Sequence, residues 1–141
     1  MLTDSDGSAS FTSGGIFFRG VRADAAFISD LRRAVRVWLE QLDVDDDRKH
    51  DVVLASYEAL ANAVEHAYDV DDDSASLDFE ATYLPQDQIL EVRVADHGCW
   101  HDADSTPTSR GHGLALIRGL ATDVIVDPTP QGTHVTIHWS L

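Results

Sequence analysis

The sequence predicts an α+β fold, a two-layer sandwich in which helices cover one face of a mixed, mostly antiparallel sheet. Early in the chain, two consecutive stretches carry apolar residues at steps of three and four; later stretches alternate apolar and polar residues. The first pattern is typical of amphipathic helices and the second of half-buried strands. Because the helices do not alternate one-for-one with strands, a layered α+β arrangement is favoured over a parallel α/β sheet.

The first half of the chain predicts one strand and two helices. The segment "GIFFRGV" at 15–21 is rich in the β-branched and aromatic residues of strands. Residues 24–42 predict a helix that Asp24 could cap. Its apolar face is formed by Phe27, Leu31, Val35, Trp38 and Leu42. A second helix is predicted from 46 to 68, before an acidic turn.

The second half predicts four strands and one short helix. Residues 77–83 and 90–94 alternate apolar and polar side chains around the turn "PQDQ", which predicts a hairpin. A polar loop follows, and "GHGLALIRGLA" at 111–121 predicts a helix with a glycine-rich start. Two more strands are predicted at 123–127 and 133–139, joined by "PTPQG".

The length of 141 residues suggests a single domain, which we place at 13–141. The acidic and polar start of the chain predicts a disordered tail over 1–12. This start lacks the basic and apolar regions of a signal peptide.

Charge and composition indicate which kinds of binding partner and cellular location fit the sequence. The chain has 25 acidic and 10 basic residues, a net charge of −15, which argues against direct binding to nucleic acid. Arg32, Arg33 and Arg36 share the first predicted helix, either as a patch for an acidic partner or as a solvated face. Cys99 is the single cysteine, which excludes an internal disulfide and is typical of the cytoplasm. No apolar run reaches the roughly 18 residues of a membrane span.

A row of polar residues interrupts the second predicted helix. In "ASYEALANAVEHAY", Glu58, Asn62 and His66 fall at i, i+4 and i+8. An asparagine oxygen suits Mg²⁺, and a glutamate one turn away could accept a proton from an attacking hydroxyl. The plainer interpretation is that Glu58 and Asn62 are polar residues on a partly exposed helix. For His66, helix capping or packing explains the residue better than chemistry does.

A second group of polar residues lies at predicted strand ends. Asp96 continues the inward-facing series of Leu90, Val92 and Val94, and Thr133 continues the inward series of the last strand. A buried carboxylate needs a strong partner. Gly98 leaves room for a ligand to approach. A carboxylate acceptor, a bare backbone and a hydroxyl together could recognise the edge of an adenine.

A third signal precedes the short helix. Gly111 and Gly113 open it directly after a polar loop, and Arg110 adds a positive charge there. A helix N-terminus suits phosphate because of its free N–H groups and its dipole. On its own this glycine pattern is a weak signal.

Taken in order, these segments resemble the motifs of the Bergerat fold, the ATP-binding fold shared by DNA gyrase, histidine kinases and MutL proteins (GHKL). "EALANAVEHAY" resembles the N box, "DHGCW" the first glycine box, "RGHGLAL" the second, and "GTHV" at 132–135 the final Gly-Thr element. Within this superfamily the sequence is most similar to small bacterial anti-sigma-factor serine/threonine kinases. The resemblance covers about residues 14–141.

The resemblance implies a cytoplasmic protein that binds ATP and Mg²⁺. Such a protein sequesters a sigma factor and phosphorylates a serine or threonine of an antagonist protein; a homodimer is plausible, and neither nucleic acid nor a membrane is a direct partner. In these terms Glu58 matches the general base, Asn62 the Mg²⁺ ligand and Asp96 the adenine-reading aspartate. The remaining matched positions are nucleotide-binding ones: Gly98, Arg110, Gly111, Gly113 and Thr133.

Two departures from the family pattern and three alternatives stay open. Trp100 stands where the first glycine box commonly has glycine, and the loop at 97–110 is short for a nucleotide lid. A regulatory module that binds ATP without phosphotransfer is the main alternative. A histidine-kinase fragment would need an upstream phosphoacceptor helix, for which about 45 residues leave little room. A zinc site is the other alternative, from His97, Cys99 and His101 flanked by Asp96 and Asp102.

Overall fold

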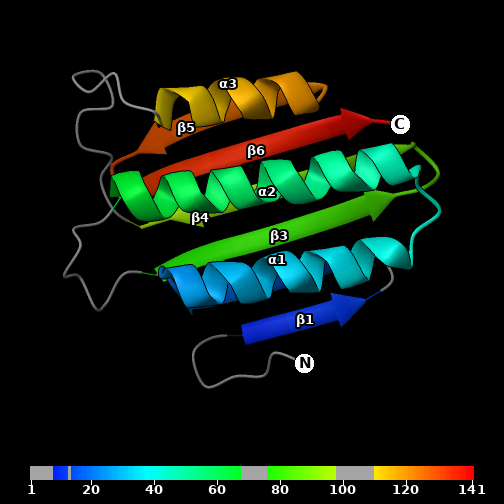
Figure 1. The fold of residues 1–141 in the computed structure, drawn as a ribbon. Helices are drawn as coiled ribbons and strands as arrows, with labels where there is room; N and C mark the ends of the chain where they lie inside the picture. Colours follow the sequence, from blue (N-terminus) through cyan, green and yellow to red (C-terminus); the bar gives the residue numbers. More distant parts are fainter. Residues whose placement is uncertain (1–7, 13, 68–75, 98–109) are drawn as a thin grey trace.

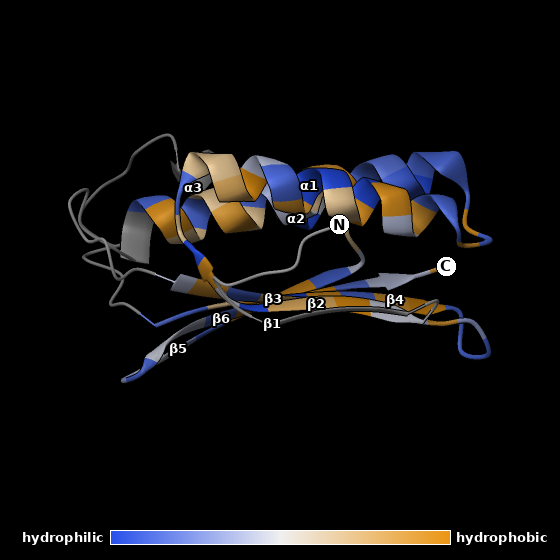
Figure 2. Cartoon of the chain, turned by 90° about the horizontal axis from the view of Figure 1, so that it is seen from below, coloured by the Kyte–Doolittle hydropathy of each residue, from blue (hydrophilic) through white to orange (hydrophobic). Residues whose placement is uncertain are grey.

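Two layers make up the fold: a six-stranded antiparallel sheet, and three helices packed on one of its faces (Figure 2). This computed structural model describes residues 8–12, 14–67, 76–97 and 110–141. The elements are β1 Ser8–Thr12, β2 Gly15–Arg22, α1 Ala25–Glu40, α2 Asp46–Ala67, β3 Ser76–Leu84, β4 Ile89–Asp96, α3 Arg110–Leu120, β5 Asp123–Thr129 and β6 Gly132–Ser140. The predicted α+β two-layer sandwich is confirmed.

The strands follow the order β1-β2-β3-β4-β6-β5 across the sheet. All five pairings between these described strands are antiparallel, so the sheet has none of the parallel pairs that a mixed sheet would include. The β3–β4 hairpin was predicted, and its register pairs Phe79 with Val94. β6 lies between β4 and β5, which joins the two C-terminal strands to the middle of the sheet.

The predicted tail at 1–12 is wrong for its last five residues. Ser8–Thr12 form strand β1, which pairs with β2 from Ser8↔Arg19 to Thr12↔Gly15. Pairing at a sheet edge is made by backbone groups, so a polar segment such as "SASFT" can join without an apolar pattern. Residues 1–7 lie outside the described part of the chain.

The core is formed where the apolar sides of the helices meet the inward side of the sheet. From α1 it takes Ile28, Leu31, Val35, Trp38 and Leu39. Phe27, predicted for this face, is only half-buried, and Ile28, three residues before Leu31 on the same face, is buried instead. From the sheet, alternate residues of β3, β4 and β6 point inward, among them Phe79, Val92 and Ile137.

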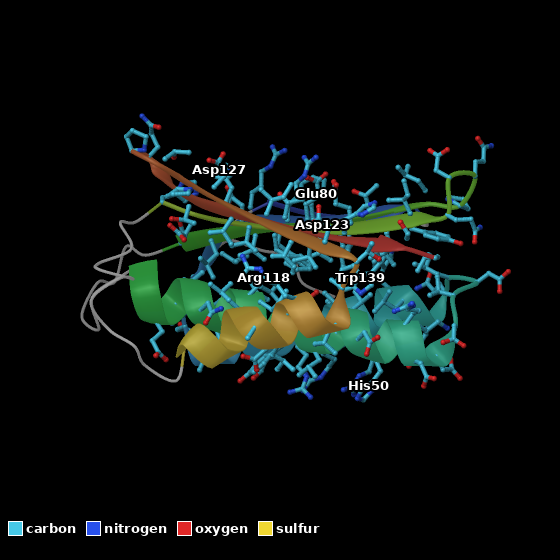
Figure 3. The ribbon with its side chains drawn as sticks, turned by 90° about the horizontal axis from the view of Figure 1, so that it is seen from above. His50, Glu80, Arg118, Asp123, Asp127 and Trp139 are labelled. Carbon is cyan, nitrogen blue, oxygen red and sulfur yellow. The ribbon has the colours of Figure 1, made fainter. Side chains whose placement is uncertain are left out.

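Two polar contacts fix the ends of helices. Asp24 is the N-cap of α1, as predicted, and its Oδ1 accepts a hydrogen bond from the N–H of Phe27 at 3.1 Å. The indole Nε1 of Trp139 donates to the carbonyl of Leu120 at 2.9 Å, which ties the last turn of α3 to β6. Trp139 accordingly lies between β6 and the helices, whereas Glu80 and Asp127 lie on the opposite side of the sheet (Figure 3). None of the helices in the described ranges has the length and apolar content needed to cross a membrane.

Candidate functional site

Four segments that are far apart in sequence meet at one end of the molecule. The C-terminal end of α2, the end of β4, the start of α3 and the start of β6 all lie at the same end of the two layers, on the left in Figure 1. The antiparallel sheet explains half of this meeting, because β4 ends beside the point where β6 begins, with Ala95 opposite His134. The helices explain the rest, because α3 packs alongside α2. The described parts of the four motif segments are therefore neighbours in the fold.

Asp96 is a buried carboxylate at this end of the sheet. Its exposed fraction is 2%, and that of Thr133 is 3%, so the predicted inward orientation of both side chains is confirmed. The backbone N–H of Thr133 donates to Oδ1 of Asp96 at 3.1 Å. A hydrogen bond to an ionised acceptor is about twice as strong as one between neutral groups. This bond therefore compensates in part for the burial of the carboxylate.

Asn62 and Glu58 differ in their surroundings although they share one face of α2. Asn62 is 1% exposed, which contradicts the interpretation that it sits on a partly exposed helix surface. Glu58, one turn earlier, is half-buried. Side chains four apart on a helix lie one above the other, so a buried amide and a half-buried carboxylate stand side by side at the site. The side chain of His66, the third member of the row, lies outside the described residues.

Among the described residues, the interior contains four buried polar side chains: Ser56, Asn62, Asp96 and Thr133. Three of them are residues that the sequence singled out, and they belong to three of the four converging segments. Buried polar groups are costly in an apolar core, and proteins retain them mostly where they are hydrogen-bonded or functional. The polar interior of this molecule is therefore concentrated at the meeting point of the motifs.

Helix α3 provides the fourth segment. It begins at Arg110, and Gly111 and Gly113 lie in its first turn, which carries no acidic residue. The free N–H groups and the dipole of such a helix start favour an anion. The side chain of Arg110 lies outside the described residues, as do Gly98 and Trp100. Of the residues of the alternative zinc site, Cys99, His101 and Asp102 also lie outside, so this alternative is untested.

A role for Gly132 was not predicted, although it stands in the "GTHV" segment. Gly132 has φ +147°, and a Cβ added there would lie 1.8 Å from the carbonyl oxygen of Asp96. Only glycine fits such a contact between two backbones. The glycine before Thr133 was the available signal, but a contact partner 36 positions earlier cannot be read from one sequence.

The predicted arginine patch borders the N-terminal half of α2, whereas the motif segments meet at the C-terminal end of that helix. Arg32 and Arg36 line a groove of about 300 Å³ between α1 and α2, together with Lys49 and with the carboxylates of Glu40 and Asp46. Arg32 stacks on the ring of Tyr57 at 5.2 Å from its centroid, and Arg33 pairs with Asp30 at 3.9 Å. The acidic neighbours offset much of the positive charge, so the patch is less basic than the helix sequence alone suggests.

Comparison with known proteins agrees with this geometry. Residues 21–139 match the family model of the histidine kinase-like ATPase domain. Among similar solved structures are the RsbU and RsbW domains of Rv1364c from Mycobacterium tuberculosis, with a TM-score of 0.67 and 23% identity. That match covers 85% of this chain and 30% of that one.

A second similar structure is the histidine kinase domain of the blue-light activated histidine kinase EL346 from Erythrobacter litoralis, with a TM-score of 0.58 and 20% identity. It covers 96% of this chain and 66% of that one. At these identities the two structures establish a shared fold, and this chain spans less than two thirds of either. The family match takes in most of the chain, including parts of all four motif segments. The chain belongs to the histidine kinase-like ATPase domain family.

Proposed function

We propose that this protein binds Mg·ATP and transfers the γ-phosphoryl group to a serine or threonine of an antagonist protein, while it sequesters a sigma factor. The observation that carries the proposal is the concentration of buried polar side chains, Asn62, Asp96 and Thr133, where the motif segments meet. The family match supports ATP as the substrate. The resemblance to anti-sigma-factor kinases supports the nature of the acceptor, and the similar structure that contains an RsbW domain is consistent with it.

The donor set suits a purine nucleotide. We assign to Asp96 the role of accepting a hydrogen bond from the exocyclic amino group of adenine, since its carboxylate is buried and held by Thr133. The Thr133 hydroxyl would serve a ring nitrogen of the base. Gly98 would allow the base to approach. On the phosphate side, the start of α3 with Arg110, Gly111 and Gly113 would bind the phosphate oxygens.

Mg²⁺ fits the same site through Asn62. Its side-chain oxygen is a neutral hard ligand, which suits an ion that bridges to substrate phosphates and keeps several waters. When bound, the ion would neutralise charge on the phosphates. Asn62 contributes by its position, because its burial on α2 restricts the rotamers of the amide.

Glu58 is the residue to which we assign proton transfer. The hydroxyl oxygen of the acceptor serine or threonine forms the new O–P bond, the bond between the γ-phosphorus and its bridging oxygen breaks, and ADP leaves. The hydroxyl proton passes to the carboxylate of Glu58. Being half-buried, Glu58 can face an acceptor that arrives from solvent. Phosphoryl transfer depends mainly on positioning and charge stabilisation, and Glu58 as base and Asn62 as metal ligand would supply two of the parts it needs.

The decisive experiment compares wild type with Glu58→Gln in two assays. Calorimetry measures ATP affinity, and γ-labelled ATP measures transfer to proteins in a lysate of the native host. We expect Glu58→Gln to keep ATP affinity within a few-fold and to lose transfer by about 10²–10⁴, the usual effect of removing a general base. Asp51→Asn is the matched control, because Asp51 lies on the same helix outside the motifs and pairs with Arg48 at 3.7 Å.

Two outcomes would contradict the proposal in different ways. If wild type binds ATP but labels no protein above the enzyme-free background, the protein is an ATP-binding regulatory module without kinase activity. If Glu58→Gln transfers label as fast as Asp51→Asn, another group accepts the proton and the assignment of Glu58 is wrong.

A further inference from the structure

The turn that leads into β6 presses against the backbone of β4 where that strand ends. At Gly132, φ is +147°, a backbone conformation that other residues rarely adopt. An added Cβ would lie 1.8 Å from the carbonyl oxygen of Asp96, 2.8 Å from its carbonyl carbon and 2.9 Å from the Cα of His97. All three atoms belong to the backbone, so no side chain can move aside to relieve the clash. The close approach therefore depends on the missing side chain of residue 132.

This approach sets the orientation of the Asp96 carboxylate. Thr133 follows Gly132 directly, and its N–H reaches Oδ1 of Asp96 at 3.1 Å. A carboxylate has about four acceptor positions on its two oxygens. A backbone donor fixed on Oδ1 favours one rotation of the carboxylate group. The other acceptor positions on the two oxygens then keep one direction. If residue 132 moved away, Thr133 would move with it, and this donor would leave Oδ1.

The turn itself is braced by Thr129. The hydroxyl of Thr129 donates to the carbonyl oxygen of Gly132 at 2.7 Å and accepts a hydrogen bond from the N–H of Gln131 at 3.2 Å. A continuous series of contacts thus runs from Thr129 through Gly132 and Thr133 to the carboxylate of Asp96.

We propose that Gly132 is a specificity-determining positioning residue: it lets the Thr133 N–H hold the Asp96 carboxylate in the orientation that accepts the 6-amino group of adenine. This inference rests on the proposed role of Asp96 in nucleotide binding. Gly132 makes no contact with the base in this arrangement. It acts through Asp96, and its effect is confined to the hydrogen bond with the amino group.

The test measures two ligands, ATP and purine riboside 5′-triphosphate, which lacks the 6-amino group. Wild type should bind ATP at least about tenfold more tightly, as expected for a hydrogen bond to a charged acceptor. Gly132→Ala should lose about tenfold in ATP affinity while its affinity for the analogue stays within about threefold of wild type. The double variant Gly132→Ala/Asp96→Ala should lose little more ATP affinity than Asp96→Ala alone, because both substitutions remove the same interaction.

Gly20→Ala is the matched control. Gly20 also has a positive φ, +65°, but an added Cβ there meets no atom within 4 Å. Gly20→Ala therefore adds a side chain at a positive-φ glycine without a backbone clash, and it should leave the affinity ratio of the two ligands unchanged. If Gly132→Ala does not fold, Thr129→Val replaces it, since this variant removes the brace without adding a clash. It should also weaken ATP selectively.

The outcomes separate this inference from the proposed function. If wild type binds both ligands equally, Asp96 does not read adenine, and both the assigned role of Asp96 and the positioning role of Gly132 fall, while phosphoryl transfer is tested separately by the labelling assay. If wild type discriminates but Gly132→Ala weakens the two ligands alike, Gly132 is structural and only the positioning role is overturned. Unchanged binding of both ligands to Gly132→Ala overturns it too, as does unchanged binding to Thr129→Val where that variant is the substitute.

Discussion

At the scale of single residues, the buried polar side chains that lower stability lie mostly at the candidate site. Burying an amide and a carboxylate in a core built from Leu, Val, Ile and aromatic residues lowers stability unless polar partners compensate. Asn62 and Asp96 are both at most 2% exposed, and the oriented Thr133 N–H supplies one such partner. We therefore expect replacement of Asn62 or Asp96 to affect ligand binding specifically.

Asn62→Ala should weaken Mg·ATP binding by about tenfold or more while it leaves metal-free ATP binding nearly unchanged, since only the first depends on a metal ligand. Calorimetry in Mg²⁺ and in EDTA measures the two affinities. Asn62→Asp keeps a side-chain oxygen and should retain most of the Mg·ATP affinity. Equal weakening with and without metal would assign Asn62 a structural role.

The sequence predicted some of these residues well and others poorly, for physical reasons. The inward orientation of Asp96 and Thr133 followed from strand alternation, because the period of two is a strict geometric rule. The contact of Gly132 did not follow, because it joins residues brought together only by the pairing of β4 with β6. The burial of Asn62 was only partly predictable. At the edge of the apolar face of a helix, apolar and polar residues are neighbours, so the sequence does not decide which of them are buried.

At the scale of elements, α1 shows how one residue defines a helix start. Asp24 both caps the helix at 3.1 Å from the N–H of Phe27 and lies 3.6 Å from Nε of Arg22. The cap satisfies a backbone donor that has no partner inside the helix, whereas an exposed ion pair contributes little.

Asp24→Ala should therefore lower the free energy of unfolding by about 1 kcal/mol, and Asp24→Asn by much less, because asparagine also caps. Urea denaturation followed by circular dichroism measures both. Asp30→Ala, which removes an acid of the same helix that pairs only loosely with Arg33, should change stability by less than about 0.5 kcal/mol. If Asp24→Asn costs as much as Asp24→Ala, the charge and not the cap is responsible.

Strong periodicity made most elements predictable. Both long helices and the strands of the two hairpins were predicted within a few residues, since each buries a clear apolar face. β1 was missed because an edge strand can be held by backbone hydrogen bonds alone, which leave no hydropathy pattern in the sequence.

At the scale of the whole molecule, nucleotide binding and stability are coupled. A ligand that binds only the folded state stabilises it by about 2.7 kcal/mol at one hundred times its dissociation constant. For a domain of this size we expect ATP at that concentration to raise the melting temperature by several degrees. GTP at the same concentration should raise it far less, because guanine presents a carbonyl where adenine presents the amino group that Asp96 would accept.

Differential scanning fluorimetry with both nucleotides, and with Asp96→Ala as the control that should lose the ATP shift, measures this prediction. Equal shifts with ATP and GTP would mean that the site does not select its base through Asp96.

The strand order also determines when the site can exist during folding. Asp96 arrives with the β3–β4 hairpin and Thr133 with the β5–β6 hairpin, and the bond between them spans 37 positions. Each hairpin can form from local contacts, but the carboxylate acquires its backbone donor only when the second hairpin docks against the first. On a ribosome, where earlier segments emerge first, a chain that still lacks β6 has Asp96 without the Thr133 donor. If Asp96 reads adenine as proposed, that recognition would therefore require the completed sheet and would come at the end of folding.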